Sequence, residues 1–170
     1  MYFAAGQPLF KQSSTNFLQV FHAPATITAI IAPLNSCLYV FLGDSENYWY
    51  MSTAEAFTKT NVSNAYYGCI WDGYLAKISS TGTYGYATTP NSATPTWTAG
   101  AALGLATGSI QGLFQYRDAN GDDQVYCSTK DGLWIHDSVT PNWFLSQLKM
   151  TGHPNGGKAF AVWGDSAYIS

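Results

Sequence analysis

Short runs of alternating apolar and polar residues, separated by turns rich in glycine and aspartate, fill most of this chain. An alternation with a period of two is typical of β-strands that bury one face. The dipeptides Asp72-Gly73 and Asn120-Gly121 accept the positive φ angles of tight hairpin turns. No segment shows a 3.6-residue apolar stripe with helix caps. The pattern predicts β-hairpins at 38–51, 69–80, 113–129 and 160–170.

The chain also repeats itself. Two copies of the phrase Ser-x-Thr-Pro-x-Trp end at Trp97 and Trp143, which lie 46 residues apart. Trp71 and Trp163 are separated by twice that spacing, 92 residues. Repeats of about 40–50 residues built from four strands are typical of β-propeller blades. A strand that ends in small or hydroxyl residues recurs too, at 2–5, 50–53, 77–80, 126–129 and 168–170.

These repeats predict an all-β fold, a β-propeller of about four to five four-stranded blades. We expect one domain over 1–170, with blades at 38–67, 68–112 and 113–158 and partial units at 1–37 and 159–170. An unpaired sheet edge is an aggregation hazard, and two arrangements avoid it. Either the C-terminal hairpin completes the N-terminal blade in a closed ring, or the chain is an incomplete ring or a segment of a larger propeller. The five copies of the recurring strand favour the second arrangement.

Composition narrows the function classes. Only 10% of the residues are charged, whereas 16% are aromatic and 46% are apolar. The net charge of −3, with seven scattered Lys and Arg residues, provides no cationic footprint for nucleic acid. A surface with so few charges is typical of extracellular, virion or carbohydrate-facing proteins. We therefore expect an extracellular or virion-surface location and no nucleic-acid partner.

Two further features are expected to be structural. The uncharged stretch 12–43 is interrupted by prolines and is rich in β-branched residues, so it predicts buried strands rather than a membrane span. The cysteines, Cys37, Cys69 and Cys127, are odd in number and lie in strand-like segments. We expect them to be buried thiols rather than a disulfide framework.

One predicted turn carries oxygen-bearing side chains at alternate positions, Asp118, Asn120 and Asp122. This run resembles the opening of the calcium loops of integrin-type propellers, in which such oxygens surround a hard cation. The sequence departs from that pattern further on, because Tyr126 stands where a later acidic ligand is expected. A metal-free hairpin tip is the alternative. Calcium is the one cofactor that the sequence suggests, and no other is expected.

The loops that end at Trp97 and Trp143 resemble the Asp-box turns of sialidase-like propellers, Ser-x-Asp-x-Gly-x-x-Trp. In both copies Ser and Thr replace the Asp and Gly of that motif. In that family the box is a structural turn whose tryptophan packs between strands. The resemblance therefore implies a propeller fold and tryptophans packed in the core, and it implies no catalytic residue.

A propeller-type glycoside hydrolase acting on extracellular polysaccharide is the alternative function. The 48–52 strand resembles the aromatic strand ending in serine of five-bladed glycoside hydrolases. Such an enzyme needs two carboxylates that face one sugar, about 5 Å or about 6.5–9.5 Å apart. The glutamates, Glu46 and Glu55, lie near one turn, and Arg117 is the only arginine. No pair of carboxylates stands out as catalytic. The three histidines lack the spacing of metal ligands. His136 is expected on the surface of a strand.

Aromatic residues that lie among short polar ones are the remaining candidates for a binding surface. Flat rings stack on sugars and offer rigid contact area to proteins. The sequence thus predicts a recognition or structural module rather than an enzyme, for instance in a phage tail or fibre. Its expected partners are other protein chains of an assembly or surface glycans, in an oligomer or a larger chain. The candidate binding residues are Tyr48, Trp49, Tyr74, Tyr84, Tyr86 and His153.

Overall fold

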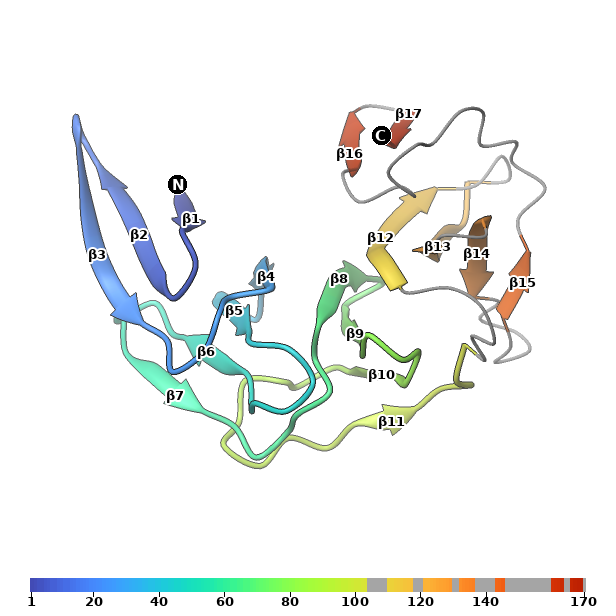
Figure 1. Cartoon of the computed structure of the whole chain (residues 1–170), viewed down its shortest axis with the longest axis horizontal. Helices are drawn as coiled ribbons and strands as arrows, with labels where there is room; N and C mark the ends of the chain where they lie inside the picture. The colour runs from blue at the N-terminus through green and yellow to red at the C-terminus, as the bar shows by residue number, and fades with distance from the viewer. Residues whose placement is uncertain are drawn as a thin grey trace.

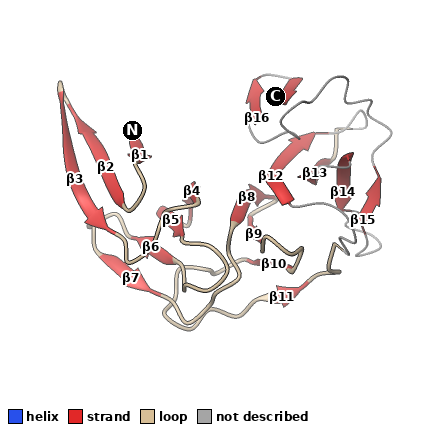
Figure 2. Cartoon of the chain, in the orientation of Figure 1, coloured by secondary structure: helices blue, strands red, loops and turns tan. Residues whose placement is uncertain are grey.

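The structure is a computed structural model that describes residues 1–103, 110–117, 121–129, 132–136, 143–145, 160–163 and 166–169. For 144–145, 160–163 and 166–169 it describes the backbone alone. All regular elements in these residues are β-strands, as Figure 2 shows. The all-β prediction is confirmed for this part of the chain.

Four antiparallel sheets follow one another along the sequence, and within each sheet every strand pairs with the next. The first sheet has three strands, β1 (Tyr2–Ala4), β2 (Pro8–Ser13) and β3 (Asn16–His22). The second comprises β4 (Ala29–Leu34), β5 (Cys37–Phe41), β6 (Trp49–Met51) and β7 (Phe57–Lys59). The third comprises β8 (Tyr67–Trp71), β9 (Tyr74–Ile78), β10 (Tyr84–Ala87) and β11 (Thr98–Ala99). The fourth comprises β12 (Ile110–Arg117), β13 (Asp123–Thr129), β14 (Gly132–His136) and β15 (Trp143–Leu145).

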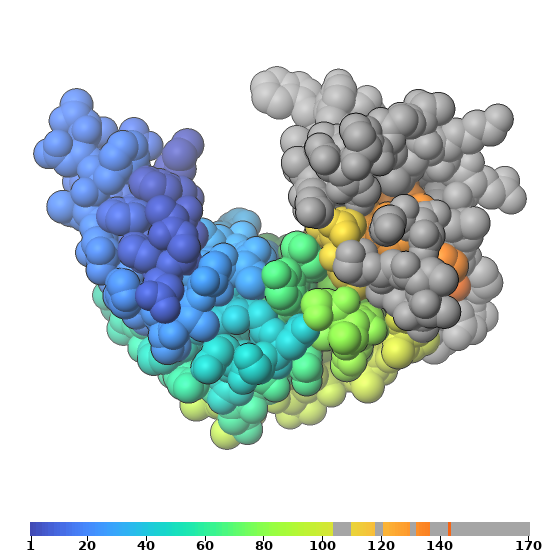
Figure 3. Space-filling view, in the orientation of Figure 1, coloured from blue at the N-terminus to red at the C-terminus, as the bar shows by residue number. Residues whose placement is uncertain are grey.

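The four sheets lie side by side along an open arc (Figure 1). Strands β1, β4, β8 and β12 lie on its concave side, and β3, β7, β11 and β15 lie on its outside. The space-filling view in Figure 3 shows the same curvature over the first three sheets. A last hairpin, β16 (Phe160–Trp163) with β17 (Ser166–Ile169), forms a separate two-stranded sheet. Among the described strands it does not join β1–β3, so the closed ring with a shared blade is not formed.

The hairpin predicted at 38–51 exists, but it occupies a different place in its sheet than expected. Strand β5 pairs with β6, with Leu38 opposite Met51. Strand β4 precedes both in the same sheet and turns into β5 at Asn35 and Ser36, whose φ angles are 51° and 57°. This hairpin therefore joins the second and third strands, whereas β8–β9 and β12–β13 join the first and second. The division of the chain into blades stays a prediction.

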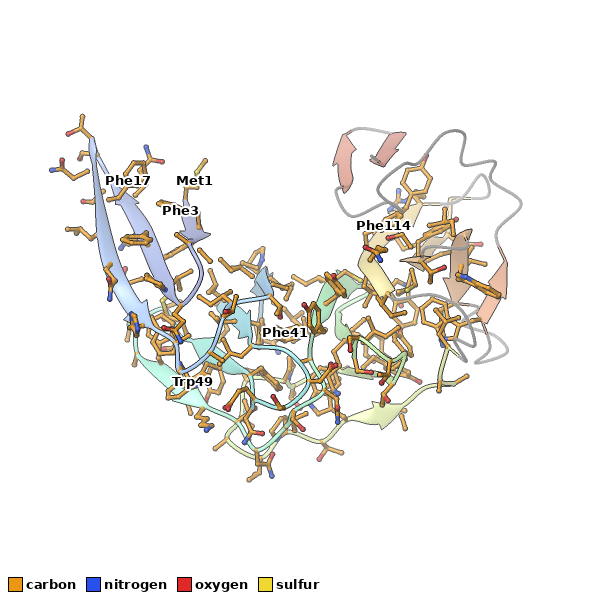
Figure 4. All side chains as sticks on the ribbon, in the orientation of Figure 1. Met1, Phe3, Phe17, Phe41, Trp49 and Phe114 are labelled. Atoms are coloured by element: carbon orange, nitrogen blue, oxygen red, sulfur yellow. The ribbon has the colours of Figure 1, made fainter. Side chains whose placement is uncertain are left out.

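Each inner sheet buries apolar side chains on both faces. In β5 the residues Tyr39 and Phe41 pack toward the third sheet, whereas Leu38 and Val40 pack toward the first. This two-sided burial explains why the strand is a continuous apolar run rather than an alternating one. Phe41 is labelled in Figure 4 in the layer between the second and third sheets. The three cysteines are buried and free, as predicted.

Aromatic side chains cross the boundaries between sheets and donate hydrogen bonds to the backbone of the next one. Trp71 Nε1 in the third sheet donates to the Asp123 carbonyl in the fourth, at 2.6 Å. The Tyr48 hydroxyl of the second sheet donates to the Pro90 carbonyl, also at 2.6 Å. Trp97 immediately precedes β11 and Trp143 begins β15, so both phrases lead into a fourth strand. Both tryptophans pack against inter-sheet cores, as predicted.

The Trp71 contact generates a stability prediction. We expect Trp71→Phe to lower the free energy of unfolding by about 1–3 kcal/mol, because the half-buried Asp123 carbonyl loses its donor while most ring contacts remain. Urea unfolding measures this loss. Phe17→Leu, at a side chain that is 57% exposed, is the control and should change stability by less than about 0.5 kcal/mol. An equal effect of both substitutions would show that the Trp71 bond does not join the sheets.

Candidate binding cleft

A cleft of about 370 Å³ lies between the first and second sheets, beside β1. Its apolar part includes Leu38 and Met51, which are buried cross-strand partners. Hydroxyl groups and one carboxylate provide the polar part, and apart from the Tyr2 hydroxyl on β1 they come from the turns that follow β4 and β6. The full lining is Tyr2, Ala32, Pro33, Ser36, Cys37, Leu38, Met51, Ser52, Thr53 and Glu55.

The one carboxylate of the lining is held by a cation. Lys11 Nζ, on β2 of the first sheet, forms an ion pair with Glu55 Oε1 of the second sheet. The hydrogen bond to Glu55 raises the pKa of the Lys11 ammonium. An exposed pair of this kind contributes little to stability, but it fixes the carboxylate across the boundary between the two sheets. Glu55 is therefore already compensated before any ligand arrives.

Two other carboxylates in the described residues also accept hydrogen bonds, one across a sheet boundary and one within a sheet. Asp44, in the second sheet, accepts hydrogen bonds from the backbone N–H and the hydroxyl of Ser80, in the third. Asp123 accepts from Gln115 Nε2 at 2.8 Å and from Arg117 Nε at 3.0 Å. Within the described part of the chain the cleft brings no second carboxylate to Glu55.

Two of the predicted binding residues are interior. Tyr48 is 0% exposed and Tyr84 is 3% exposed, so their expected place on the surface is wrong. Both rings lie between sheets: Tyr48 packs edge-on against Trp97, and Tyr84 against Trp143, with centroids 5.9 Å and 5.1 Å apart. Burial raises the pKa of both phenols. Trp49 is half-buried and packs on Phe21 of the first sheet.

Tyr74 and Tyr86 are half-buried and form an aromatic group with Trp71 near the 72–73 turn. Tyr74 stacks on Trp71 at 5.4 Å, and Tyr86 meets Tyr74 edge-on at 5.3 Å. The structure does not bring these rings into the cleft, since none of the predicted aromatic residues lines it. Binding by Tyr74 and Tyr86 stays a prediction, and His153 lies outside the described residues.

The predicted calcium loop is only partly described. Asp118 and Asn120 lie outside the described residues, and Asp122 is exposed beside Gly121. No group of three His, Cys, Asp or Glu residues that could hold a metal occurs in the part of the chain that the structure describes. The calcium loop thus stays a prediction.

His136 is buried, at 2% exposure, and its predicted surface position is wrong. Its ring lies 4.7 Å from the Tyr84 ring and 5.2 Å from the Trp143 ring, centroid to centroid. The physical reason is that this end of β14 packs against the third sheet instead of facing water. A histidine on an alternating strand can face either side, and the sequence alone did not distinguish them.

A buried lysine lies at the boundary between the second and third sheets. Lys77, on β9, is 7% exposed and donates to the carbonyls of Ser63 and Asn64, both at 3.1 Å. Its ammonium also lies 5.3 Å from the centre of the Trp97 ring. Burial lowers the pKa of Lys77 to about 8, although the charge of Asp44 acts in the opposite direction. Lys77 therefore titrates close to physiological pH without lining the cleft.

Sequence reasoning missed the cleft, whose residues come from β1, from β4, β5 and the turn between them, and from β6 and the turn that follows it. Ordinary residue types such as Leu38, Met51 and Ser52 carry no chemical motif.

The chain is similar to two structures of the extracellular domain of BT4673 from B. thetaiotaomicron. One, described as part of a hybrid two component system, has a TM-score of 0.65 and 13% identity and covers 90% of this chain and 20% of that chain. The other, described as part of a one component system, has a TM-score of 0.67 and 13% identity and covers 94% and 22%. The chain thus spans about a fifth of the length of these structures.

No family model and no curated protein matches the chain. At 13% identity the structural likeness shows a shared all-β fold. The described residues include no helix that is long and apolar enough to cross a membrane.

Lys77 generates a prediction about pH. Between pH 8 and the unfolded-state value of 10.5 the unfolded chain binds a proton at Lys77 that the folded chain has lost. The contribution of Lys77 to stability therefore rises with pH in this window, by up to about 1.4 kcal/mol per pH unit, and is lost as the pH falls through 8. We expect the stability of the native chain relative to Lys77→Met to increase from pH 7.5 to 9.5 in urea unfolding.

The comparison with Lys77→Met is needed because buried thiols and phenols act in the opposite direction. Burial raises the pKa of Cys69, Cys127 and Tyr84, so their contributions fall as the pH rises through the unfolded-state values of 9.0 and 10.0. These losses occur in both proteins and cancel in the difference. A difference that stays flat across the window would show that the folded-state pKa of Lys77 is not lowered.

Proposed function

We propose that this chain is a segment of a β-propeller and acts as an extracellular recognition module rather than as an enzyme. Consecutive meanders stack face to face, with their first strands on the concave side, and this is how propeller blades are arranged. The open arc supports the incomplete-ring interpretation of the repeats. The ring would be completed by further sheets of a longer or multi-chain assembly.

The observation that carries the proposal is the cleft between the first two sheets. Its floor is apolar, its polar groups are mainly hydroxyls, and its one carboxylate is paired with Lys11. Ligand sites typically combine an apolar surface with a few polar groups that fix orientation. Hydrolysis of a glycosidic bond would need a second carboxylate opposite Glu55. The cleft is therefore suited to binding without chemistry.

Two further observations support the setting. The similar structures are extracellular domains, and the low charge of the chain is typical of extracellular and virion-surface proteins. We propose an extracellular location, which includes the surface of a phage tail or fibre. Protein segments and glycans are the partner classes, because hydroxyls and aromatic rings serve both.

The proposal predicts that filling the cleft removes binding. We expect Ser52→Trp, at the mouth of the cleft, to weaken binding of a ligand found in glycan and peptide arrays by at least about tenfold, as measured by calorimetry. Thr98→Trp, at an exposed position on the outer strand β11, is the matched control and should bind normally. Release of reducing sugar from a polysaccharide by the native chain, abolished in Glu55→Gln, would instead establish the hydrolase.

A further inference from the structure

Strand β3 forms the outer edge of the first sheet, and this edge differs from the outer edges of the other sheets. The strands in the same place, β7, β11 and β15, have three, two and three residues. Strand β3 has seven residues, and its sequence contains no acidic residue, lysine, arginine or proline. Native proteins protect an open edge by brevity, charge or proline, and β3 has none of these.

The outer edge of β3 is exposed near the β2–β3 turn. Residues 16–19 are exposed, whereas Val20 and Phe21 are half-buried and pack against the core between the first two sheets. The extra residue in the register of β2 with β3 is Val20, which lies outside the exposed part. The hairpin projects beyond the second sheet in Figure 1, and among the described strands β3 pairs with β2 alone. This edge is therefore open to an approaching strand.

The outer edge of β3 does not depend on what lies beside β1. Strands β1 and β3 are at opposite edges of the three-stranded sheet, with β2 between them. After β3 the chain passes through residues 23–28 into β4 of the second sheet. A further strand paired with β1 would thus lie on the far side of the sheet and leave β3 as the outer strand.

Two residues in the exposed part of β3 direct their backbone groups outward. Gln12 N–H donates to the Met1 carbonyl, so the backbone groups of Gln12 face β1. In an antiparallel pair both residues face each other or both face away, so Phe17, the partner of Gln12, faces away from β2. By alternation Leu18 faces β2 and Gln19 faces outward again. The N–H and C=O groups of Phe17 and Gln19 therefore lie at the open edge.

We propose that two copies of this chain associate through β3, each adding its outer strand to the sheet of the other. Two-fold symmetry makes the two strands antiparallel and places Leu18 of one copy opposite Leu18 of the other. In this register each Phe17 lies opposite Gln19 of the other copy, and each such pair exchanges both backbone hydrogen bonds. Registers centred on Phe17 or on Gln19 would pair only one of the two outward residues.

A second copy fits this edge because the edge is complementary to itself. Like charges directly opposite each other oppose strand pairing, and the segment 16–20 carries no charged side chain. Lys11, the neighbour of Leu18 on β2, is already paired with Glu55. Leu18 is 54% exposed and would be covered by its counterpart. Interfaces below about 1,200 Å² are typical of weak association, so we expect a dissociation constant of about 10–1,000 µM.

The two-fold symmetry allows a charge-swap test by sedimentation equilibrium. Leu18→Lys and Leu18→Glu each place like charges opposite each other, so each variant alone should dimerise at least about fivefold more weakly than the native chain. An equimolar mixture of the two variants places opposite charges together and should associate within about threefold of the native chain. Thr98→Lys, at an exposed position on β11, is the matched control and should dimerise normally.

Two further measurements test the backbone bonds. Gln19→Pro removes an outward N–H, whereas Gln19→Val retains it, so only the proline variant should dimerise at least about tenfold more weakly. Amide exchange of the native chain should slow with rising concentration at Phe17 and Gln19, and by more than at Leu18, whose N–H already faces β2.

A native chain that stays monomeric up to about 1 mM would overturn the inference. Association that the Leu18 charges leave unchanged, or that the mixture of the two variants does not restore, would assign the contact to another surface and would also overturn it. These measurements involve no ligand of the cleft. The inference goes beyond the proposed recognition function, and either can fail without the other.

Discussion

The structure depends on one constraint, that each inner sheet is apolar on both faces and must be covered on both. Strand β5 is the clearest example. Tyr39 and Phe41 are buried against the third sheet, whereas Leu38 and Val40 are buried against the first. Burying apolar surface is the main favourable term in folding, and a lone four-stranded meander would leave half of that surface in water. The sheets are therefore stable only as a stack. On the first sheet the exposed Phe17 contacts Phe3 on a face that no other described sheet covers (Figure 4).

The same constraint explains how the chain can fold with so few charged residues. Where two sheets meet, polar groups must be satisfied locally, because an unpaired donor or acceptor removed from water is costly. Trp71, Tyr48 and Lys77 all meet this requirement by donating to backbone carbonyls of an adjacent segment. Long side chains with one terminal donor can pack along an apolar layer and still reach a carbonyl at its rim. The Lys11–Glu55 ion pair, in contrast, lies at an exposed boundary between two sheets.

The features that sequence analysis identified are local. The hairpins at 72–73 and 121 follow from the residues in their turns. Trp97 and Trp143 lie at equivalent positions because the sequence repeat places each of them at the start of a fourth strand. The side of a strand on which a residue lies could not be predicted in this way. An aromatic residue occurs in the same sequence pattern whether its side chain faces water or a neighbouring sheet. Tyr48, Tyr84 and His136 were misplaced for this reason. The order of strands in the second sheet was also hidden, since β4 contains Pro33 and the 50–53 segment resembles a second strand in composition but lies third.

The cleft could not have been predicted from its residues, because it forms only where the first sheet stacks on the second. Leu38 and Met51 are typical core residues, and Ser52, Thr53 and Glu55 are typical turn residues. The stacking brings Tyr2 of β1 into the same lining, and no described strand pairs with the inner edge of β1. An edge of this kind invites pairing, which native proteins prevent with charge, proline or brevity. Here β1 is only three residues long, and the Lys11–Glu55 pair lies beside it. Shortness and charge thus both limit pairing at the edge of β1.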